Sequence, residues 1–250
     1  MMNTHLLITA HSGALGTQGN SMEYLIQACL AQPDFIEIDL RKTLDGKVVL
    51  SHDPCLAGCS LSIAEMMYED MVLHEPSLLL LEDAFDICFA HDVKVNLDIK
   101  EYEVVAPACA VIEARQCSSQ VLFSGCREHE IFLVRQLLPF AKVLYNAHPW
   151  DRQTYPVYRA YAQAMIETAQ ESDAFGLNIS CEYVQEELFG LARKEMLPIF
   201  VWTVESRAQM RMMIAYGAAS LTTKNVPLLK EELACLEEEL SEMVCLDPHA

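Results

Sequence analysis

The sequence has few basic residues and no long apolar segment. Its 17 lysines and arginines face 36 aspartates and glutamates, which gives a formal net charge of −19, and they form no basic run. Because nucleic acids and anionic membranes bind through positive charge, neither is expected as a partner. The apolar run at the N-terminus is only as long as a strand and follows no basic leader. We therefore expect a cytoplasmic protein without a secretion signal or a membrane span.

Closely spaced cysteines are scarce too, although the chain has ten cysteines. Most of them lie singly in apolar segments, which is typical of reduced thiols and not of a disulfide framework. Cys55 and Cys59 flank a loop next to His52, so a metal or redox pair is the alternative interpretation there. A second pair with the spacing of a zinc site is missing, and we favour free thiols.

The sequence also lacks internal repeats, low-complexity segments and linkers rich in proline, glycine or serine. A hydrophobic content of 52% is enough to bury one large core, and a length of 250 residues is ordinary for one closed α/β barrel. We therefore predict a single domain over residues 1–250.

What the sequence does contain is a regular alternation of apolar strand-like runs with segments of helical periodicity. The predicted strands are 5–10, 35–40, 93–98, 119–124, 141–146, 174–179, 197–203 and 218–222, and the clearest predicted helices are 21–31, 102–115, 127–138, 155–170 and 183–194. The run 47–51 follows Asp45-Gly46, a link too short for a parallel crossover, and should pair with 36–42 as a hairpin. The remaining strands predict a (β/α)8 barrel, the TIM-barrel fold.

The predicted strands end in polar residues, and in a parallel barrel the functional groups lie at these C-terminal ends. The first strand is followed by His11 and Ser12, and the hairpin strand ends just before His52. Glu37 and Asp39 are two residues apart, so they share one face of their strand. Burying both carboxylates costs several kcal/mol unless they meet a cation, which favours a site. A solvated acidic edge strand is the alternative.

The segment 95–100 places Asn96, Asp98 and Lys100 on one face of another strand. If the barrel closes, Glu37, Asp39 and Asp98 could surround a divalent cation. Ligands that are all carboxylates favour Mg²⁺, Ca²⁺ or Mn²⁺ over zinc. Lys100 would then supply positive charge for an anionic ligand.

In this order, the segments HSG, EID, LDGKVVLSHD, VNLDIK and VWTVE resemble the glycerophosphodiester phosphodiesterase family, within the phospholipase C-like phosphodiesterases. The family patterns HRG, E-x-D, T-x-DG-x-x-V-x-x-HD, N-x-E-x-K and W-T-V-N follow in the same order over about residues 7–227. The resemblance implies a distorted (β/α)8 barrel. It also implies metal-dependent hydrolysis of a small-molecule substrate, a glycerophosphodiester, to glycerol 3-phosphate and an alcohol.

Residue roles follow from the same resemblance. His11 and His52 would be the catalytic acid/base pair, one deprotonating the neighbouring glycerol hydroxyl and the other protonating the leaving alcohol, after which water opens a cyclic phosphate. The metal ligands would be Glu37, Asp39 and Asp98. The residues that would contact the substrate are Lys100, Ser12 and Trp202.

Several positions depart from the family pattern. Ser12 replaces an Arg that grips phosphate, and a hydroxyl cannot replace that charge, although Lys224 could partly compensate. Gly19 replaces a carboxylate, Asp98 is one methylene shorter than the family's Glu, and Glu205 adds negative charge where the family has Asn. These losses keep an alternative open: a divergent or catalytically weak barrel that binds a metal or a phosphorylated ligand, or acts on a different phosphodiester.

Two further segments carry expectations. The segment 54–76 is shorter than the subdomain that the family inserts there, so the site should be more open. The segment 226–250 should form a final helix that packs on the barrel, with homodimerisation as the alternative. Its apolar stripe consists of Leu229, Leu233, Leu236, Leu240 and Val244. His148, after the strand at 141–146, could line the mouth of the barrel.

Overall fold

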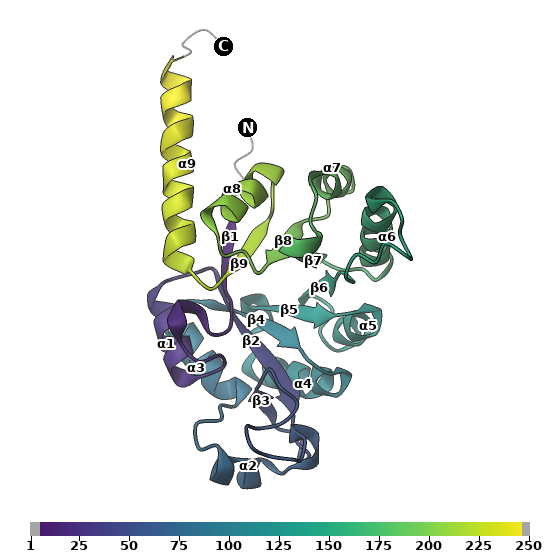
Figure 1. Ribbon diagram of the computed structural model, residues 1–250. Coiled ribbons are helices and arrows are strands. Elements are labelled where there is room, and N and C mark those ends of the chain that lie inside the picture. The colour runs from purple at the N-terminus through teal and green to yellow at the C-terminus, as the bar shows by residue number, and fades with distance from the viewer. Residues whose placement is uncertain (1–5, 247–250) are drawn as a thin grey trace.

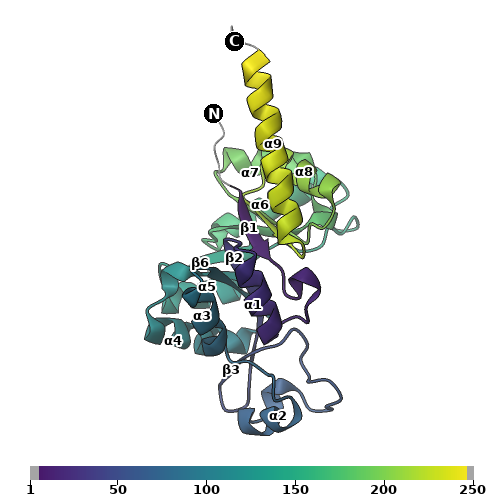
Figure 2. The ribbon, with the colours of Figure 1, turned by 90° about the vertical axis from the view of Figure 1, so that its left-hand side faces the viewer.

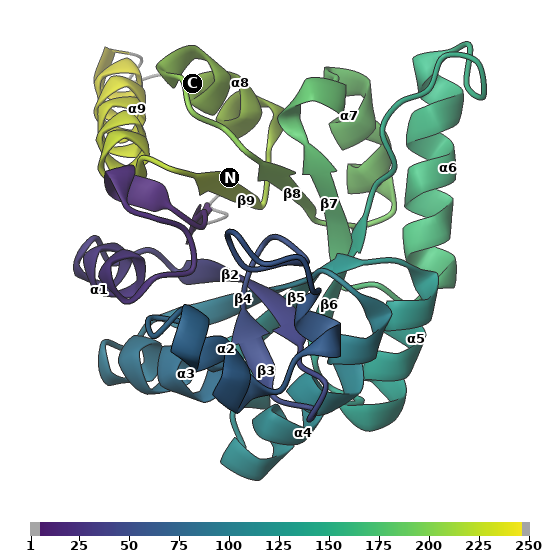
Figure 3. The ribbon, with the colours of Figure 1, turned by 60° about the horizontal axis from the view of Figure 1, so that its bottom comes forward.

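The protein is a closed barrel of parallel strands with helices on its outside, seen in a computed structural model that describes residues 6–246 (Figures 1–3). The strands are β1 (Leu7–Ala10), β2 (Phe35–Lys42), β3 (Val48–Leu50), β4 (Lys94–Ile99), β5 (Val121–Cys126), β6 (Lys142–Asn146), β7 (Gly176–Ser180), β8 (Ile199–Trp202) and β9 (Ser220–Thr223). The helices are α1 (Met22–Leu30), α2 (Tyr68–His74), α3 (Leu81–Ala90), α4 (Val105–Arg115), α5 (Glu128–Leu137), α6 (Tyr158–Glu171), α7 (Glu186–Lys194), α8 (Arg207–Tyr216) and α9 (Val226–Leu246).

The barrel closes through β1, which pairs in parallel with β9 on one side and with β2 on the other. The pairing of β1 with β2 covers only Phe35 and Ile36. Beyond them, β3 pairs antiparallel with the end of β2, with Leu50 opposite Leu40. The (β/α)8 barrel and the hairpin that the sequence predicts are therefore both confirmed. Each barrel strand lies within about two residues of a predicted strand.

The interior of the barrel changes from apolar to polar along the strands. Four buried side chains close the interior near the N-terminal ends of their strands: Phe35, Leu122, Leu144 and Phe200. Because side chains alternate along a strand, Glu37 follows Phe35 into the same interior. Asn96 on β4 and Asn178 on β7 are also buried polar residues. The apolar floor leaves the polar groups at the C-terminal mouth, where barrels of this kind carry their function.

The outer helices cover the barrel with their apolar faces, and several begin at defined caps. Ser21 precedes α1 and its Oγ accepts the N–H of Tyr24 at 3.1 Å, as expected for a residue that caps this helix. The ranges picked out by helical periodicity include neither α3 nor α8. In α8 only Met210 and Met213 are buried, so its apolar stripe is sparse.

Two segments extend beyond the barrel at opposite ends of the molecule (Figures 1 and 2). Between β3 and α3, the segment 51–80 holds α2 and a small apolar cluster made of Val49, Leu56, Ile63, Met66 and Met71. At the other end α9 begins against the barrel, where Leu229 is buried and Leu233 is half-buried. The side chains of Leu240 and Val244 lie outside the described residues. The expected packing of this helix on the barrel is confirmed for its first turns.

Candidate active site

Strand register brings the predicted acidic residues together at the mouth of the barrel. Glu37 and Asp39 lie on β2, and their partners on β4 are Asn96 and Asp98. Carboxylate oxygens of Glu37, Asp39 and Asp98 all lie within 4.8 Å of one another. Among the residues that the structure describes, this is the group of acidic, histidine or cysteine side chains that could hold a metal ion.

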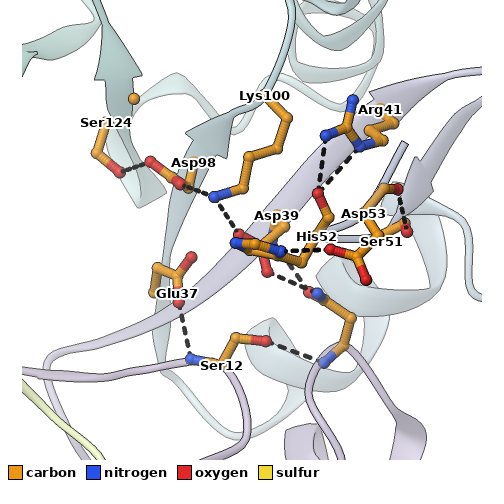
Figure 4. A network of polar contacts seen from close by, with 12 residues as sticks. Ser12, Glu37, Asp39, Arg41, Ser51, His52, Asp53, Asp98, Lys100 and Ser124 are labelled. Carbon is orange, nitrogen blue, oxygen red and sulfur yellow. Dashed lines mark hydrogen bonds and ion pairs between the residues drawn. The ribbon is translucent and has the colours of Figure 1, made fainter. Parts of the chain in front are cut away.

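Glu37 and Asp39 are buried, whereas Asp98 is half-buried. The Oε2 atom of Glu37 accepts the backbone N–H of Ser12 at 2.7 Å (Figure 4). Burial and the neighbouring carboxylates of Asp39 and Asp98 raise the pKa of Glu37 well above its usual value, against the smaller effect of that N–H. A free carboxylate at this position is therefore costly, and a cation that binds there would relieve the cost.

Lys100 bridges the other two acids. Its Nζ lies 2.7 Å from Oδ1 of Asp39 and 2.5 Å from Oδ2 of Asp98 (Figure 4). Burial alone would lower the pKa of Lys100, but Asp98 and Asp39 outweigh burial and raise it above the usual value of a lysine. The lysine is thus charged and already engaged by two carboxylates.

Asn20 orients Asp39 by two hydrogen bonds. Its Nδ2 donates to Oδ2 of Asp39 at 2.6 Å, and its Oδ1 accepts the backbone N–H of Asp39 at 3.0 Å. Asn20 was not among the site residues predicted from the sequence. Because its two contacts cross from the loop before α1 to β2, no local pattern predicts them.

The donor set fits a divalent metal. Three carboxylates meet one ammonium, so the cluster has an excess of negative charge that one divalent ion would neutralise. Asn96 lines the same pocket, and its buried Oδ1 has no hydrogen-bond partner among the described residues. Oxygen-only ligands of this kind suit Mg²⁺, Ca²⁺ or Mn²⁺.

The two predicted catalytic histidines lie on the same mouth but in different surroundings. His11 is half-buried, and Nδ1 lies 3.1 Å from the carbonyl oxygen of Ser12. Burial, with the positive charge of Lys224, lowers the pKa of His11 below the usual value of a histidine. His52 has a side chain that is 72% exposed, and its Nδ1 lies 2.9 Å from Oδ1 of Asp53.

Arg41 fixes the backbone at His52. Its Nε and Nη2 donate to the carbonyl oxygen of His52 at 3.1 and 2.8 Å, and its Nη1 pairs with Glu101 at 3.0 Å (Figure 4). Arg41 was not among the predicted site residues. The sequence did carry a signal for it, because Arg41 continues the period-two series of Glu37 and Asp39 on β2.

Two adjoining pockets share His11, Asp39 and His52. The mouth pocket has a volume of about 360 Å³ and is also lined by Glu37, Asn96, Asp98, Lys100, Ser124, Gly125, Asn146, Asn178 and Trp202. The outer pocket has a volume of about 490 Å³ and is also lined by Ser12, Asn20, Asp53, Glu75, Ser77 and Lys224. The structure therefore brings every sequence-predicted site residue to one of these two pockets.

Other strand ends complete the mouth pocket and were not predicted as site residues. Ser124 donates its hydroxyl to Oδ1 of Asp98 at 3.0 Å, and Asn146 accepts from the backbone N–H of Gly125 and from Nδ2 of Asn178. Gly125 has a positive φ of 71°, and a Cβ there would lie 2.7 Å from Oδ1 of Asp98. Only glycine allows this approach.

Four other residues singled out from the sequence lie outside the acidic cluster of Glu37, Asp39 and Asp98. Glu205 is exposed and lines a separate recess with Lys224. Cys59 contacts Met66, and neither it nor Cys55 belongs to the metal-capable group among the described residues. His148 is exposed and packs edge-on against Tyr145, outside both pockets.

The fold and the site define a (β/α)8 barrel whose mouth combines two histidines with three carboxylates that could hold a divalent cation. The chain belongs to the glycerophosphoryl diester phosphodiesterase family, whose model matches residues 11–228, and it is thus a phosphodiesterase. No helix in the part of the chain that the structure describes is long and apolar enough to cross a membrane.

Individual relatives are distant in sequence but similar over most of their length. A glycerophosphodiester phosphodiesterase of Caldanaerobacter subterraneus subsp. tengcongensis is 23% identical over 244 residues, covering 87% of this chain and 93% of the relative. The glycerophosphodiester phosphodiesterase structure of Thermotoga maritima has a TM-score of 0.72 at 23% identity and covers 91% of this chain and 98% of its own. An Oleispira antarctica phosphodiesterase in complex with the product sn-glycerol-3-phosphate has a TM-score of 0.77 at 17% identity, covering 91% and 96%.

Proposed function

We propose that the protein hydrolyses glycerophosphodiesters to glycerol 3-phosphate and an alcohol, in a reaction that depends on a divalent metal ion. The observation that carries this proposal is the convergence of three carboxylates and two histidines on one barrel mouth. The family membership supports the reaction class, and the related Oleispira antarctica enzyme was solved with sn-glycerol-3-phosphate as its product.

Glu37, Asp39 and Asp98 would hold the metal in this proposal. When bound, the ion supplies positive charge at the phosphoryl oxygens, which a phosphodiester needs because its own charge repels a nucleophile. Mg²⁺, Ca²⁺ and Mn²⁺ are the candidates. Lys100 holds Asp39 and Asp98 in place and adds to the positive charge that faces the substrate.

His11 is suited to take a proton. Its lowered pKa keeps the imidazole neutral at pH 7, so a ring nitrogen is available as a base for the neighbouring hydroxyl of the glycerol moiety. His52 is suited to give a proton to the leaving alcohol, because it lines both pockets and Asp53 lies against its Nδ1 and orients the ring.

The testing experiment measures release of glycerol 3-phosphate from a panel of glycerophosphodiesters with Mg²⁺, Ca²⁺, Mn²⁺ or EDTA. We expect activity that requires metal and falls by roughly 10²–10⁴-fold in His52→Ala. His91→Ala is the matched control, because His91 is an exposed histidine at the end of α3 whose Nδ1 contacts only a backbone carbonyl.

The losses at Ser12 and Gly19 favour one competing function, a barrel that binds metal or a phosphorylated ligand without efficient turnover. That function predicts a folded protein that is silent across the panel yet binds metal in a titration. Turnover that persists in His52→Ala or in EDTA would contradict the proposed mechanism.

A further inference from the structure

Besides the metal ion, a positive side chain that is free to bind the phosphoryl group would favour the proposed reaction, and Lys100 is already engaged by carboxylates. Its ammonium is held at 2.7 Å by Asp39 and at 2.5 Å by Asp98. A second positive group that faces the pockets without a carboxylate partner would bind an anionic substrate at lower cost, because no ion pair has to break.

Lys224 is such a group. It lines the outer pocket together with His11 and Ser12. Within residues 6–246, its side chain makes no hydrogen bond or ion pair, in contrast to Lys100. Glu205 shares a neighbouring recess with it but forms no ion pair with it.

The backbone places Lys224 firmly beside the loop that carries His11. The N–H of His11 donates to the carbonyl of Thr223 at 2.9 Å, and the N–H of Leu15 donates to the carbonyl of Lys224 at 2.9 Å. On the other side, Asn225 caps α9 by accepting the N–H of Leu228 at 3.1 Å. These hydrogen bonds on both sides fix the backbone from which the Lys224 side chain extends.

The surroundings of Lys224 add positive potential. The N-terminal end of α1 lies on the outer pocket through Gly19, Asn20 and Ser21, and the N-terminus of a helix carries partial positive charge. Ser12 offers a hydroxyl but no charge, and its backbone N–H is already bound to Glu37. The acidic groups that line this pocket are Asp39, Asp53 and Glu75. Asp39 is paired with Lys100, and Asp53 and Glu75 each have a hydrogen-bond partner of their own.

We propose that Lys224 is the residue that binds the phosphoryl oxygens of the substrate and of the phosphomonoester product, a role in which Ser12 has no charge to offer. This inference rests on the proposed function. It makes Lys224 a substrate-binding residue whose removal raises KM more than it lowers kcat.

The test compares Lys224→Met and Lys224→Arg with Lys47→Met, which removes the same charge from the exposed β2–β3 turn. Steady-state kinetics use the best glycerophosphodiester of the panel, and calorimetry measures glycerol 3-phosphate binding to the metal-loaded protein. We expect KM and the Kd of glycerol 3-phosphate to rise by roughly 10- to 100-fold in Lys224→Met, the range for a hydrogen bond to a charged group. Lys224→Arg should restore most of the binding, and Lys47→Met should match the wild type.

Two measurements separate the remaining outcomes: the salt dependence of glycerol 3-phosphate binding, and binding by a wild type that shows no turnover. Added NaCl should weaken glycerol 3-phosphate binding more in the wild type than in Lys224→Met, because screening acts on the charge that the variant lacks. If the wild type shows no turnover, the proposed function fails, but the binding titration still decides the role of Lys224. Unchanged Kd and KM in Lys224→Met, or a wild type that binds no glycerol 3-phosphate, would overturn the inference.

Discussion

The mouth pocket and the outer pocket adjoin, but they hold their polar residues by different means. In the mouth pocket, Glu37, Asp39 and Asp98 are fixed by the register of two neighbouring strands. In the outer pocket, His52 and Lys224 follow strand ends. The position of His52 depends on hydrogen bonds from the Arg41 side chain, and that of Lys224 on a backbone hydrogen bond from Leu15. A strand fixes a side chain through the whole sheet, whereas a loop fixes it through a few contacts.

The two pockets also differ in what they confine. The mouth pocket concentrates negative charge on buried carboxylates. This raises the pKa of Glu37 and favours the binding of a cation. The outer pocket is more exposed and is lined by Lys224, whose ammonium has no carboxylate partner among the described residues. Under the proposed function, metal affinity would reside in the sheet and substrate affinity in the loops, so changes in each pocket should affect different constants.

The largest effect is expected from Glu37→Gln, which keeps the shape of the side chain and its contact with the Ser12 N–H but removes one ligand charge. We expect metal affinity to fall sharply and kcat/KM to drop by roughly 10³-fold or more, since a catalytic metal contributes several kcal/mol. Calorimetric titration with Mn²⁺ and steady-state kinetics measure the two changes.

Glu130→Gln is the matched control for this variant. Glu130 is also buried and also accepts a backbone N–H, that of Arg127 at 2.8 Å, but it caps α5 away from the mouth. The Glu130→Gln variant should therefore retain activity. Wild-type metal affinity in Glu37→Gln would show that the mouth pocket is not the metal site.

A smaller effect is expected from Arg41→Met, which tests how the loop residue His52 is positioned. Loss of the two hydrogen bonds to the His52 carbonyl should lower kcat by roughly tenfold to a hundredfold with little change in KM, because a catalytic group displaced by about 1 Å loses activity on that scale. Arg41→Lys should recover part of the activity, since a lysine can restore one of the two bonds.

Arg135→Met controls for the general effect of removing such an arginine. Arg135 also donates to backbone carbonyls, those of Ala141 and Asp173, but it lies on α5 away from both pockets. An equal loss of kcat in Arg41→Met and Arg135→Met would mean that stability, not the position of His52, explains the change.

The sequence predicts the mouth pocket better than the loop contacts, for a physical reason. The pair Glu37 and Asp39 is visible because strand side chains have a period of two, and the closed barrel follows from the alternation of elements. The pairing of Asp39 with Asp98 was inferred only by assuming closure, because register between distant strands leaves no local signal. The (β/α)8 barrel and the hairpin were confirmed.

Contacts between segments that are distant in the sequence could not be predicted. Asn20 was not among the predicted site residues, but it binds both the side chain and the backbone of Asp39. Gly125 looked like the end of an apolar strand, and its close approach to Asp98 depends on a backbone conformation that composition does not reveal. The roles of the site residues, the single domain and homodimerisation through α9 stay predictions.

The smallest effect is expected in the stability of the metal-free protein and concerns the buried carboxylate of Glu37. The folded-state pKa of Glu37 is raised, so between its unfolded value near 4.5 and the higher folded value the folded protein binds more protons than the unfolded chain. By linkage, the contribution of Glu37 to stability therefore falls as pH rises through this window.

Glu37→Gln removes this dependence. In EDTA, we expect its Tm to exceed that of the wild type by an amount that grows as pH rises from 4.5, with each kcal/mol worth roughly 2–4 °C at this chain length. Saturating Mn²⁺ should reverse the order, because the metal stabilises only the wild type. Glu130→Gln should show no such growth. Calorimetric scans in EDTA at several pH values test this, and a Tm difference that is constant with pH would mean that Glu37 is not a strained carboxylate in the metal-free protein.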